Sequence, residues 1–332
     1  MMDKILLGHG SGGKLMHALI REFFSPAFGN AGTGDSAVVG VSSNRLAYTT
    51  DSYVVSPLFF PGGNIGDLAV CGTVNDLSVA GAEPRYLTAG FIIEEGFPLA
   101  DLKKIIVSMA EAARLAGVTI VAGDTKVVNR GKADGVFINT SGIGVLADGI
   151  EITPKNIREG DAVIISGELG NHGVAILAER NGLSFDPPVE SDTRPLYSLV
   201  KSIYRASDKI RFMRDPTRGG LATTLKEAAL ESELCIRIRE QALPIPQPVR
   251  GACGLLGLDP LYVANEGILV VIADAGAAER IVAEMHNHEY GKVAAIIGSV
   301  DRSAPGMVLL ETAIGGSRIL DMLPGEMLPR IC

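Results

Sequence analysis

Five aspartates stand in short motifs of small, polar and apolar residues, and they are the first candidates for chemistry. They are Asp35 in TGDSAVV, Asp51 in TTDSYVV, Asp76 in VNDLSVAGA, Asp124 in VAGDTKVV and Asp215 in MRDPTRGG. A carboxylate among apolar neighbours is costly to bury unless it is paired or bound to a cation. Converging acids would also repel a polyanionic substrate, and Mg²⁺ that bridges carboxylates and phosphates cancels that repulsion. Each aspartate could instead be a helix cap or a turn residue.

The flanks of three of these aspartates indicate where they lie. Asp51 and Asp124 follow apolar, strand-like stretches, so we expect both where a strand gives way to a loop. Asp76 falls on the small-residue side of a predicted helix, near Gly72 and Ser78. The apolar flanks indicate buried strands and a packed helix, which makes five unrelated caps or turns the weaker interpretation of the set.

A glycine-rich loop covers residues 8–14, with the sequence GHGSGGK. It matches GxxxxGK, the start of a Walker A phosphate-binding loop, but such a loop needs Ser or Thr next to hold Mg²⁺. Leu15 stands at that position, so we do not expect a Walker A loop. The backbone amides could cover phosphates in another way, or the segment could be a plain flexible loop.

Two further charged residues could take part in the transfer of protons and charge. Lys126 stands two residues after Asp124, where an ammonium group could steady a phosphate or a developing negative charge. Glu266, in YVANEGILVVIA, comes directly before an apolar strand and beside Gly267, so it could be a general base. The alternatives are a surface lysine and an ordinary Asn-Glu-Gly turn.

The last residue, Cys332, places a thiol at the end of the segment PRIC. This segment is not a prenylation box, which needs three residues after the cysteine. A terminal thiol is reactive once ionised, although the neighbouring α-carboxylate disfavours the thiolate. We expect residues 324–332 to be a mobile tail, because they contain two prolines and no periodicity. Fully extended, the tail would reach up to roughly 30 Å. An idle terminal cysteine is the alternative.

Composition limits the classes of protein to which the chain can belong. Its 332 residues are 47% apolar and 20% charged, which predicts a packed globular protein of about two domains. No apolar run approaches the roughly 20 residues of a membrane-spanning helix. The N-terminus has no signal-peptide pattern, so we expect a cytoplasmic protein with no membrane contact. A net charge of −8 without a basic cluster argues against nucleic acid as a partner.

The four cysteines are too scattered for a zinc site or a disulfide framework. We expect Cys71, Cys235 and Cys253 to be buried as small apolar residues.

Hydrophobic periodicity predicts helices over residues 14–24, 67–82, 99–117, 173–182, 195–206, 220–231 and 277–288. Strands are predicted over residues 46–51, 86–94, 118–122, 136–146, 162–166, 268–273 and 293–297. Because this order has no regular βαβ repeat, we expect an α+β fold of layered domains rather than a doubly wound sheet. A polar, turn-rich stretch over residues 148–161 predicts a boundary between two domains. The expected units are a glycine-rich segment 1–34, domains 35–150 and 151–323, and the tail 324–332.

Taken together, these motifs resemble those of the superfamily of aminoimidazole ribonucleotide synthetase, selenophosphate synthetase and thiamine monophosphate kinase. The shared order is a glycine-rich N-terminus, then GDSAV, TD, NDL, GDT and a later D-x-T-x-G-G before a helix. Within this superfamily, HGSGG, MRDPTRGGL, NEG and the terminal PRIC are similar to the HypE family of hydrogenase maturation proteins. The likeness runs from Leu7 to Cys332, and the order of the motifs together with the terminal cysteine makes it specific.

The resemblance implies two PurM-like α/β domains and a homodimer that holds ATP near the subunit interface. It implies that Lys126 and Glu266 serve a dehydration step and that Cys332 accepts a carbamoyl group from the carbamoyltransferase HypF. It further implies that the residues around Mg²⁺ and ATP are Asp35, Asp51, Asp76, Asp124 and Asp215, with Gly10, Gly12 and Gly13 in a mobile loop beside the phosphates.

The implied reaction is an ATP-dependent dehydration of the carbamoyl group on Cys332 to a thiocyanate. ATP would phosphorylate the amide oxygen, a base would take the amide protons, and phosphate would leave. The cyano group would then pass to iron held by a HypC–HypD complex, for the cyanide ligands of a nickel–iron hydrogenase.

Two other functions stay open. One is an ATP-dependent synthetase or kinase that acts on a small metabolite, in which case Cys332 is incidental. The other is a non-catalytic carrier of a modified cysteine, which would have no need of Mg–ATP.

Overall fold

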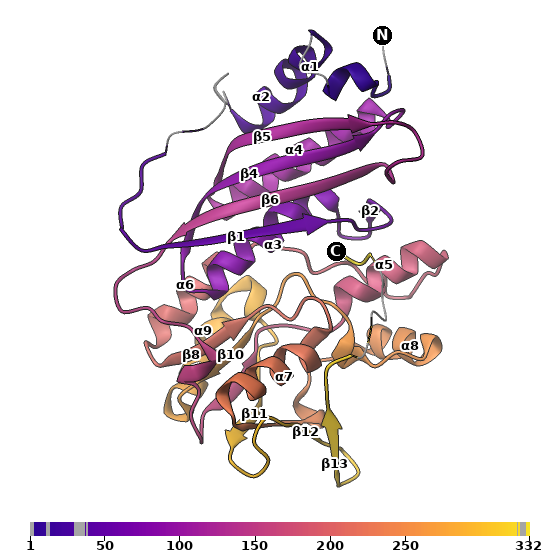
Figure 1. Ribbon diagram of the computed structural model, residues 1–332. Helices are drawn as coiled ribbons and strands as arrows, with labels where there is room; N and C mark the ends of the chain where they lie inside the picture. Colours follow the sequence, from indigo (N-terminus) through magenta and orange to yellow (C-terminus); the bar gives the residue numbers. More distant parts are fainter. Residues whose placement is uncertain (1–2, 11–13, 30–36, 38, 324, 326–329) are drawn as a thin grey trace.

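The computed structural model describes residues 3–10, 14–29, 37, 39–323, 325 and 330–332. Two layered units follow each other along the chain, and each is built on its own mixed sheet. Figure 1 shows the N-terminal unit above and the C-terminal unit below, with the C-terminus at their junction. This arrangement confirms the prediction of layered α/β units without a doubly wound sheet.

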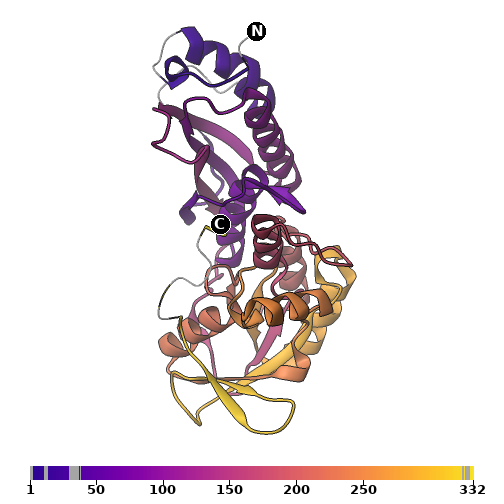
Figure 2. The ribbon, with the colours of Figure 1, turned by 90° about the vertical axis from the view of Figure 1, so that its right-hand side faces the viewer.

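The N-terminal unit contains a four-stranded sheet in the order β1-β6-β4-β5 (Figure 1). Its strands are β1 (Leu46–Tyr53), β4 (Glu83–Glu94), β5 (Thr119–Val128) and β6 (Val136–Val145). β6 pairs antiparallel with both β1 and β4, and β4 pairs parallel with β5. Helices α3 (Ile65–Val79) and α4 (Leu99–Ala116) pack on one face of this sheet (Figure 2). A small hairpin of β2 (Phe59–Phe60) and β3 (Gly63–Asn64) leads into α3.

Local signals set the ends of these two helices. The Asn64 side chain accepts a hydrogen bond from Gly66 N, and the Asp67 side chain accepts one from Asn64 N, so a capping box starts α3. α4 ends at Gly117, which adopts the left-handed conformation with φ 71°. Almost every residue of α3 is buried, because the helix lies between the sheet and the C-terminal unit.

Short helices precede the sheet and lie over β5 in Figure 1. They are η1 (Leu7–Gly10), α1 (Lys14–Leu19), η2 (Ile20–Phe24) and α2 (Ser25–Phe28). The ring of Phe24 packs edge-on against Phe91 of β4, with 5.1 Å between the centroids. The predicted helix over residues 14–24 is therefore present, and it packs on the sheet through its aromatic side chains.

The C-terminal unit contains a seven-stranded sheet in the order β13-β12-β9-β11-β7-β10-β8. The strands are β7 (Ala162–Ile165), β8 (Ile210–Arg214), β9 (Cys235–Arg239), β10 (Val270–Ala273), β11 (Ala295–Asp301), β12 (Val308–Glu311) and β13 (Ser317–Leu320). The helices are α5 (Asn171–Asn181), α6 (Tyr197–Ala206), α7 (Gly220–Ser232), α8 (Gln247–Leu256) and α9 (Ala275–Asn287). Single turns lie at η3 (Pro154–Asn156), η4 (Glu240–Ala242), η5 (Pro260–Tyr262) and η6 (Glu289–Gly291).

The central strands of this sheet are buried on both faces. Along β7, Val163 and Ile165 belong to one apolar cluster and Ile164 belongs to another on the opposite side. Such strands have a continuous apolar sequence rather than an alternating one. This explains why β7 and β10 could be predicted, whereas β8 and β9, in which Arg211 and Arg237 interrupt the apolar pattern, were missed.

Cys71, Cys235 and Cys253 are buried, as predicted. Among the described residues, no helix is both long enough and apolar enough to cross a bilayer.

Candidate active site

Asp51 and Asp76 lie on facing surfaces of β1 and α3. Asp51 is inside β1, which continues to Tyr53, so the expectation that Asp51 marks the end of the strand is wrong. Alternate residues of a strand share a face, and Thr49, Asp51 and Tyr53 point toward α3. The Thr49 hydroxyl donates to Asp76 Oδ2 at 2.8 Å, and the Tyr53 hydroxyl donates to Asp51 Oδ2 at 3.2 Å. These two bonds orient both carboxylates.

Asp215 and Glu266 come from the C-terminal unit and are almost completely buried, with exposed fractions of 6% and 2%. Asp215 directly follows β8, and Glu266 lies in the loop before β10. Asp192 fixes that loop, because its two carboxylate oxygens accept from Glu266 N at 3.1 Å and Gly267 N at 3.0 Å. A Cβ on Gly267 would lie 1.6 Å from the Asp192 carbonyl oxygen, so only glycine fits there.

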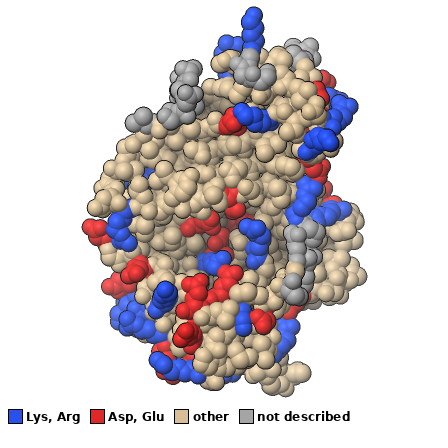
Figure 3. Space-filling model, viewed as in Figure 1, with Lys and Arg blue, Asp and Glu red and all other residues tan. Residues whose placement is uncertain are grey.

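Asp51, Asp76, Asp215 and Glu266 influence one another, and we call these four residues the acidic cluster. The pKa of Asp215 is raised to about 7, mainly by burial and to a smaller extent by the charge of Asp76. The pKa of Glu266 is raised well above its ordinary value, mainly by burial and to a smaller extent by the charge of Asp215. Burial also raises the pKa of Asp76, and the charge of Asp51 adds to this effect. Figure 3 shows acidic side chains gathered across the middle of the molecule, where the two units meet.

The acidic cluster fits a divalent cation that arrives together with phosphate. Within the described part of the chain, no group of three or more His, Cys, Asp or Glu side chains is arranged to hold a metal ion alone. Mg²⁺ commonly takes only one or two carboxylates and completes its coordination with water and phosphate oxygens. Such a cation would favour the ionised form of Asp215, whose charge burial now opposes.

Asp124 and Lys126 do not join the acidic cluster. β5 pairs with β4 as far as Val128, so the expectation that Asp124 marks the end of a strand is wrong. Thr125 is buried on the helix side, and its two neighbours therefore point to the opposite face, which we call the outer face of the sheet. Both side chains are exposed there, and Lys126 Nζ lies 3.1 Å from Asp124 Oδ1.

The glycine-rich loop begins against the same strand. A Cβ on Gly10 would come within 2.4 Å of Val127 N, so the backbone of Gly10 lies directly on β5 beside Lys126. Three other predicted site residues lie outside the described residues: Gly12, Gly13 and Asp35. Within one chain, the described site residues other than Cys332 thus fall into two groups, the acidic cluster and the group on β5.

The C-terminus lies beside the end of β1 at the junction of the two units (Figures 1 and 2). Val54 N donates to the main-chain oxygen of Cys332 at 3.3 Å, and Ser56 N donates to the Arg330 carbonyl oxygen at 3.1 Å. Arg330 Nε donates to the Val54 carbonyl oxygen at 2.9 Å. The side chain of Ile331 is 4% exposed. The last three residues, which we call the docked tail, therefore have a defined position, and mobility of the tail stays a prediction.

Two residues of α5 hold the docked tail, and neither of them was predicted from the sequence. His172 is completely buried, and its Nε2 lies 2.9 Å from the Ile331 carbonyl oxygen. Arg180 donates to the Ser56 carbonyl oxygen at 2.6 Å and to the Arg330 carbonyl oxygen at 2.8 Å. The one available signal was a histidine next to the apolar stretch GVAIL, which indicates a buried imidazole but not its partner.

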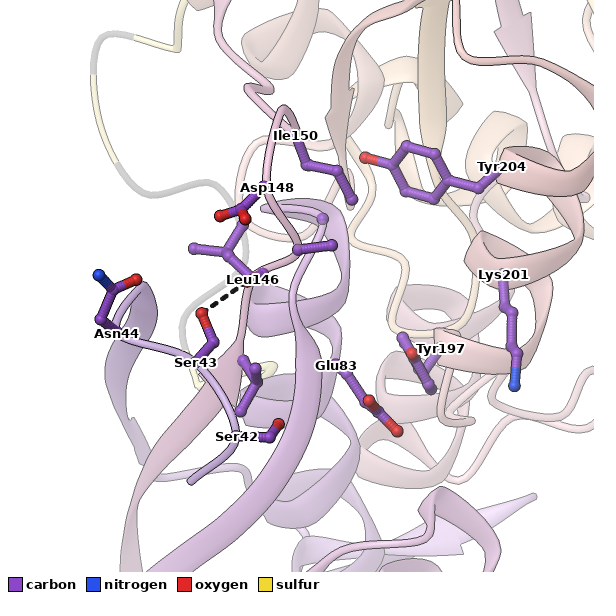
Figure 4. Close-up of a pocket in the computed structure, with 13 residues that line it drawn as sticks. Ser42, Ser43, Asn44, Glu83, Leu146, Asp148, Ile150, Tyr197, Lys201 and Tyr204 are labelled. Carbon is purple, nitrogen blue, oxygen red and sulfur yellow. Dashed lines mark hydrogen bonds between the residues drawn. The ribbon is translucent and has the colours of Figure 1, made fainter. Parts of the chain in front are cut away.

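A separate cavity of about 650 Å³ lies near the start of β1 and the end of β6 (Figure 4). α6 contributes Tyr197, Lys201 and Tyr204, and the segment after β6 contributes Asp148 and Ile150. The Tyr204 hydroxyl is buried and has no hydrogen-bond partner among the described residues. None of the predicted site residues that the structure describes lines this cavity, so it is distinct from the acidic cluster.

Comparison with known proteins identifies relatives of the whole chain. The AIR synthase related protein family matches in two parts, the N-terminal domain over residues 33–146 and the C-terminal domain over residues 158–308. The chain is 54% identical to carbamoyl dehydratase HypE of Bradyrhizobium diazoefficiens, over 98% of this chain and 95% of that protein.

Two solved structures share the fold over nearly the whole chain. A crystal structure of hydrogenase maturation protein HypE in complex with ATP is 48% identical, with a TM-score of 0.95 over 98% of this chain and 99% of that one. A crystal structure of a HypE–HypF complex is 51% identical, with a TM-score of 0.82 over 92% of this chain and 100% of that one. The two sheets are therefore those of PurM-like domains.

Proposed function

The chain belongs to the HypE family of AIR synthase related proteins, and from this premise we propose that it is an ATP-dependent carbamoyl dehydratase. Its substrate is a carbamoyl group on Sγ of its own Cys332, and its product is a thiocyanate that supplies cyanide to the iron of a nickel–iron hydrogenase. The names of the relatives support the dehydratase activity. A solved relative in complex with ATP supports the nucleotide.

The observation that carries the proposal is the position of Cys332. Its main chain is bound by Val54, which directly follows Tyr53. The Tyr53 hydroxyl in turn donates to Asp51 of the acidic cluster. Cys332 therefore lies beside the end of the strand that also carries a member of the acidic cluster. A carrier that only presented its cysteine to partners would need no such arrangement.

The reaction we propose removes one oxygen and two protons from the carbamoyl group. The amide oxygen attacks the γ-phosphorus of ATP, ADP leaves, and the amide loses its first proton to give an imidate phosphate. Loss of the second N–H proton then breaks the C–O bond, so that phosphate departs and S–C≡N remains. The balance is thiocarbamate plus ATP to thiocyanate, ADP and phosphate, with no oxidation or reduction.

Glu266 is the base in this proposal. Burial raises its pKa well above the ordinary value, and a carboxylate with a raised pKa is a stronger base once it is ionised. Asp192 accepts hydrogen bonds from the backbone of the loop and so keeps Glu266 beside the other members of the acidic cluster. One or two of the carboxylates of Asp51, Asp76 and Asp215 would hold Mg²⁺, which supplies charge neutralisation for the triphosphate when it is bound.

Lys126, which the resemblance assigns to the same step as Glu266, lies on the outer face and does not reach Glu266 within one chain. A homodimer formed through the outer face would give Asp124 and Lys126 a place at the subunit interface. Exposed apolar side chains support such a contact, because Tyr48 and Ile92 on the outer face are 70% and 46% exposed. In this proposal Asp35, Gly10, Gly12 and Gly13 complete the phosphate site.

We also propose the partners and the compartment. A solved complex of a relative with HypF supports a HypF-type carbamoyltransferase as the protein that loads Cys332. A HypC–HypD complex would then take the cyano group, and all these steps would occur in the cytoplasm.

Mass spectrometry of the C-terminal peptide tests the proposal. With HypF, carbamoyl phosphate and ATP, we expect Cys332 to gain a carbamoyl mass and then to lose one water. Glu266→Gln should stop at the carbamoyl form, with dehydration slowed at least about 100-fold. Glu279→Gln, which changes an exposed acid of α9, should behave as wild type. A carbamoyl mass that never loses water, with ATP present, would show a carrier and not a dehydratase.

A further inference from the structure

His172 occupies a position that allows only one arrangement of its hydrogen bonds. Its Nε2 faces the Ile331 carbonyl oxygen at 2.9 Å, and its Nδ1 faces the Ser191 hydroxyl at 2.8 Å. A carbonyl oxygen can only accept, so Nε2 carries the hydrogen. Burial lowers the pKa of His172, which keeps the ring neutral and leaves Nδ1 to accept from Ser191. The ring of Phe60 packs edge-on against the imidazole at 5.6 Å between centroids and fixes its orientation.

The same imidazole is joined to the loop that carries Glu266. Ser191, which bonds His172 Nδ1, is followed directly by Asp192, whose carboxylate holds Glu266 N and Gly267 N. Ser191 is itself anchored to the N-terminal unit, because its backbone N donates to the Pro61 carbonyl oxygen at 2.8 Å. One short segment therefore connects the docked tail on one side with the loop of Glu266 on the other.

We propose that His172 is a positioning residue that ties the docked tail, through Ser191 and Asp192, to the loop that carries Glu266. Nε2–H holds the Ile331 carbonyl, one residue before the thiol, and so sets where Cys332 lies when the base acts. The inference rests on the proposed dehydration and adds a residue to it. His172 does not contact the reacting atoms, and it acts through the main chain of the tail.

Two substitutions separate the hydrogen bond from the packing of the ring. In His172→Gln, the side-chain amide nitrogen can take the place of Nε2 and still donate to Ile331. In His172→Asn, the shorter side chain reaches only the position of Nδ1, so the bond to Ser191 can persist and the bond to Ile331 is lost. Both substitutions remove the ring. His172→Asn can keep only the bond to Ser191 and His172→Gln only the bond to Ile331, so the comparison shows which of the two bonds sets docking and dehydration.

Alkylation of Cys332 by iodoacetamide measures docking, and single-turnover dehydration measures positioning. For His172→Asn, we expect alkylation to be about tenfold faster and dehydration about tenfold slower, the size of one lost hydrogen bond. The KM for ATP should not change, and His172→Gln should stay within about threefold of wild type in both rates. The buried thiols of Cys71, Cys235 and Cys253 are internal controls for unfolding.

Three results would overturn the proposal: both rates unchanged in His172→Asn, an equal effect in His172→Gln, or faster alkylation without slower dehydration. A second measurement does not depend on whether a variant folds. In the full chain, ¹⁵N NMR should show the Nε2–H tautomer of His172, and this signal should shift in a chain that ends at Pro329. An identical signal in the two chains contradicts the contact. A wild-type chain that fails to dehydrate would refute the proposed function, while alkylation and NMR would still decide whether His172 holds the tail.

Discussion

At the scale of single residues, the fold works against the ionisation of Asp215. The side chain is 6% exposed and follows β8 at the junction of the two units. Burial and the nearby charge of Asp76 raise its pKa to about 7, whereas Arg214 only partly offsets this. A bound divalent cation would favour the ionised form of Asp215, because its charge would offset the cost of burying the carboxylate and the repulsion from Asp76.

This pKa predicts how the stability of the ligand-free chain depends on pH. An acid with a raised folded pKa contributes stability that is complete below its unfolded pKa of about 4 and is lost as the pH rises toward 7. We therefore expect the free energy of unfolding of the wild type to fall over this range. Asp215→Asn should flatten the dependence and be more stable than wild type at pH 8, by roughly 1–3 kcal/mol.

Urea unfolding at several pH values measures the effect. Asp124→Asn changes an aspartate that is 61% exposed on the outer face, and it should follow the wild-type curve. A parallel fall in stability for Asp215→Asn and wild type would show that Asp215 is not the group responsible.

Residues that carry the site differ in how far the sequence could predict them. Asp51, Asp76, Asp215 and Glu266 stand in recognisable motifs, and the structure brings them together. His172 could not be found in this way, because its partner Ile331 is 159 positions away along the chain. Asp192 was missed for a similar reason, since its role is to hold the backbone of residues 266–267.

At the scale of elements, the contact between α3 and β1 positions Asp51. Tyr53 of β1 is 2% exposed, and its hydroxyl donates to Asp51 while lying close to Gly72 of α3. A Cβ on Gly72 would come within 2.2 Å of the Tyr53 hydroxyl oxygen and 3.1 Å of the ring carbon that bears it. Glycine at this helix position therefore makes room mainly for the hydroxyl group, whose oxygen would be the closest atom to a Cβ.

Gly72→Ala should destabilise the chain by about 1–3 kcal/mol, because the added methyl group overpacks a tight contact. The same change in a Tyr53→Phe background should cost less than about 1 kcal/mol, since the close atom is gone and alanine favours the helix. Gly254→Ala in α8 is the control, because a Cβ there has no atom of the described residues within 4 Å. Equal costs for Gly72→Ala in the two backgrounds would contradict the role of the hydroxyl.

Element types could be predicted better than element ends. α4 has a clear apolar stripe and a terminal glycine, and its predicted and observed bounds nearly coincide. β5 is longer than predicted, because parallel pairing with β4 carries it past the glycine and the charged residues of AGDTK. Asp124 and Lys126 lie on the outer face because the strand extends past them and alternate strand residues point to opposite faces. No local pattern in the sequence predicts this pairing of β5 with β4.

At the scale of the whole molecule, Figures 1 and 2 show no helix of the described residues over one face of the N-terminal sheet. The outer face carries Asp124 and Lys126 as well as the exposed side chains of Tyr48 and Ile92. A second copy of the chain against this face would bury the apolar groups, and it would bring two copies of Lys126 to the interface. The proposed homodimer would place the group on β5 at the subunit interface.

Ile92→Asp should shift the chain from dimer to monomer in micromolar solution, because the charge would have to be desolvated at the interface. Light scattering coupled to size exclusion measures the mass directly. Leu255→Asp changes a more exposed apolar residue, 72% exposed on α8, and should leave the mass unchanged. A wild-type chain that is monomeric, or an Ile92→Asp chain that stays dimeric, would contradict a dimer through the outer face.

The central claim is that the carbamoyl oxygen leaves Cys332 as phosphate. Following that oxygen tests the claim most directly. Cys332 is first loaded with a carbamoyl group labelled with ¹⁸O, the label is verified by intact mass, and a single turnover is started with unlabelled ATP. We predict that the ¹⁸O appears in inorganic phosphate in step with the formation of the thiocyanate. Recovery of the label in water, or its retention on the protein while ATP is hydrolysed, would contradict the account.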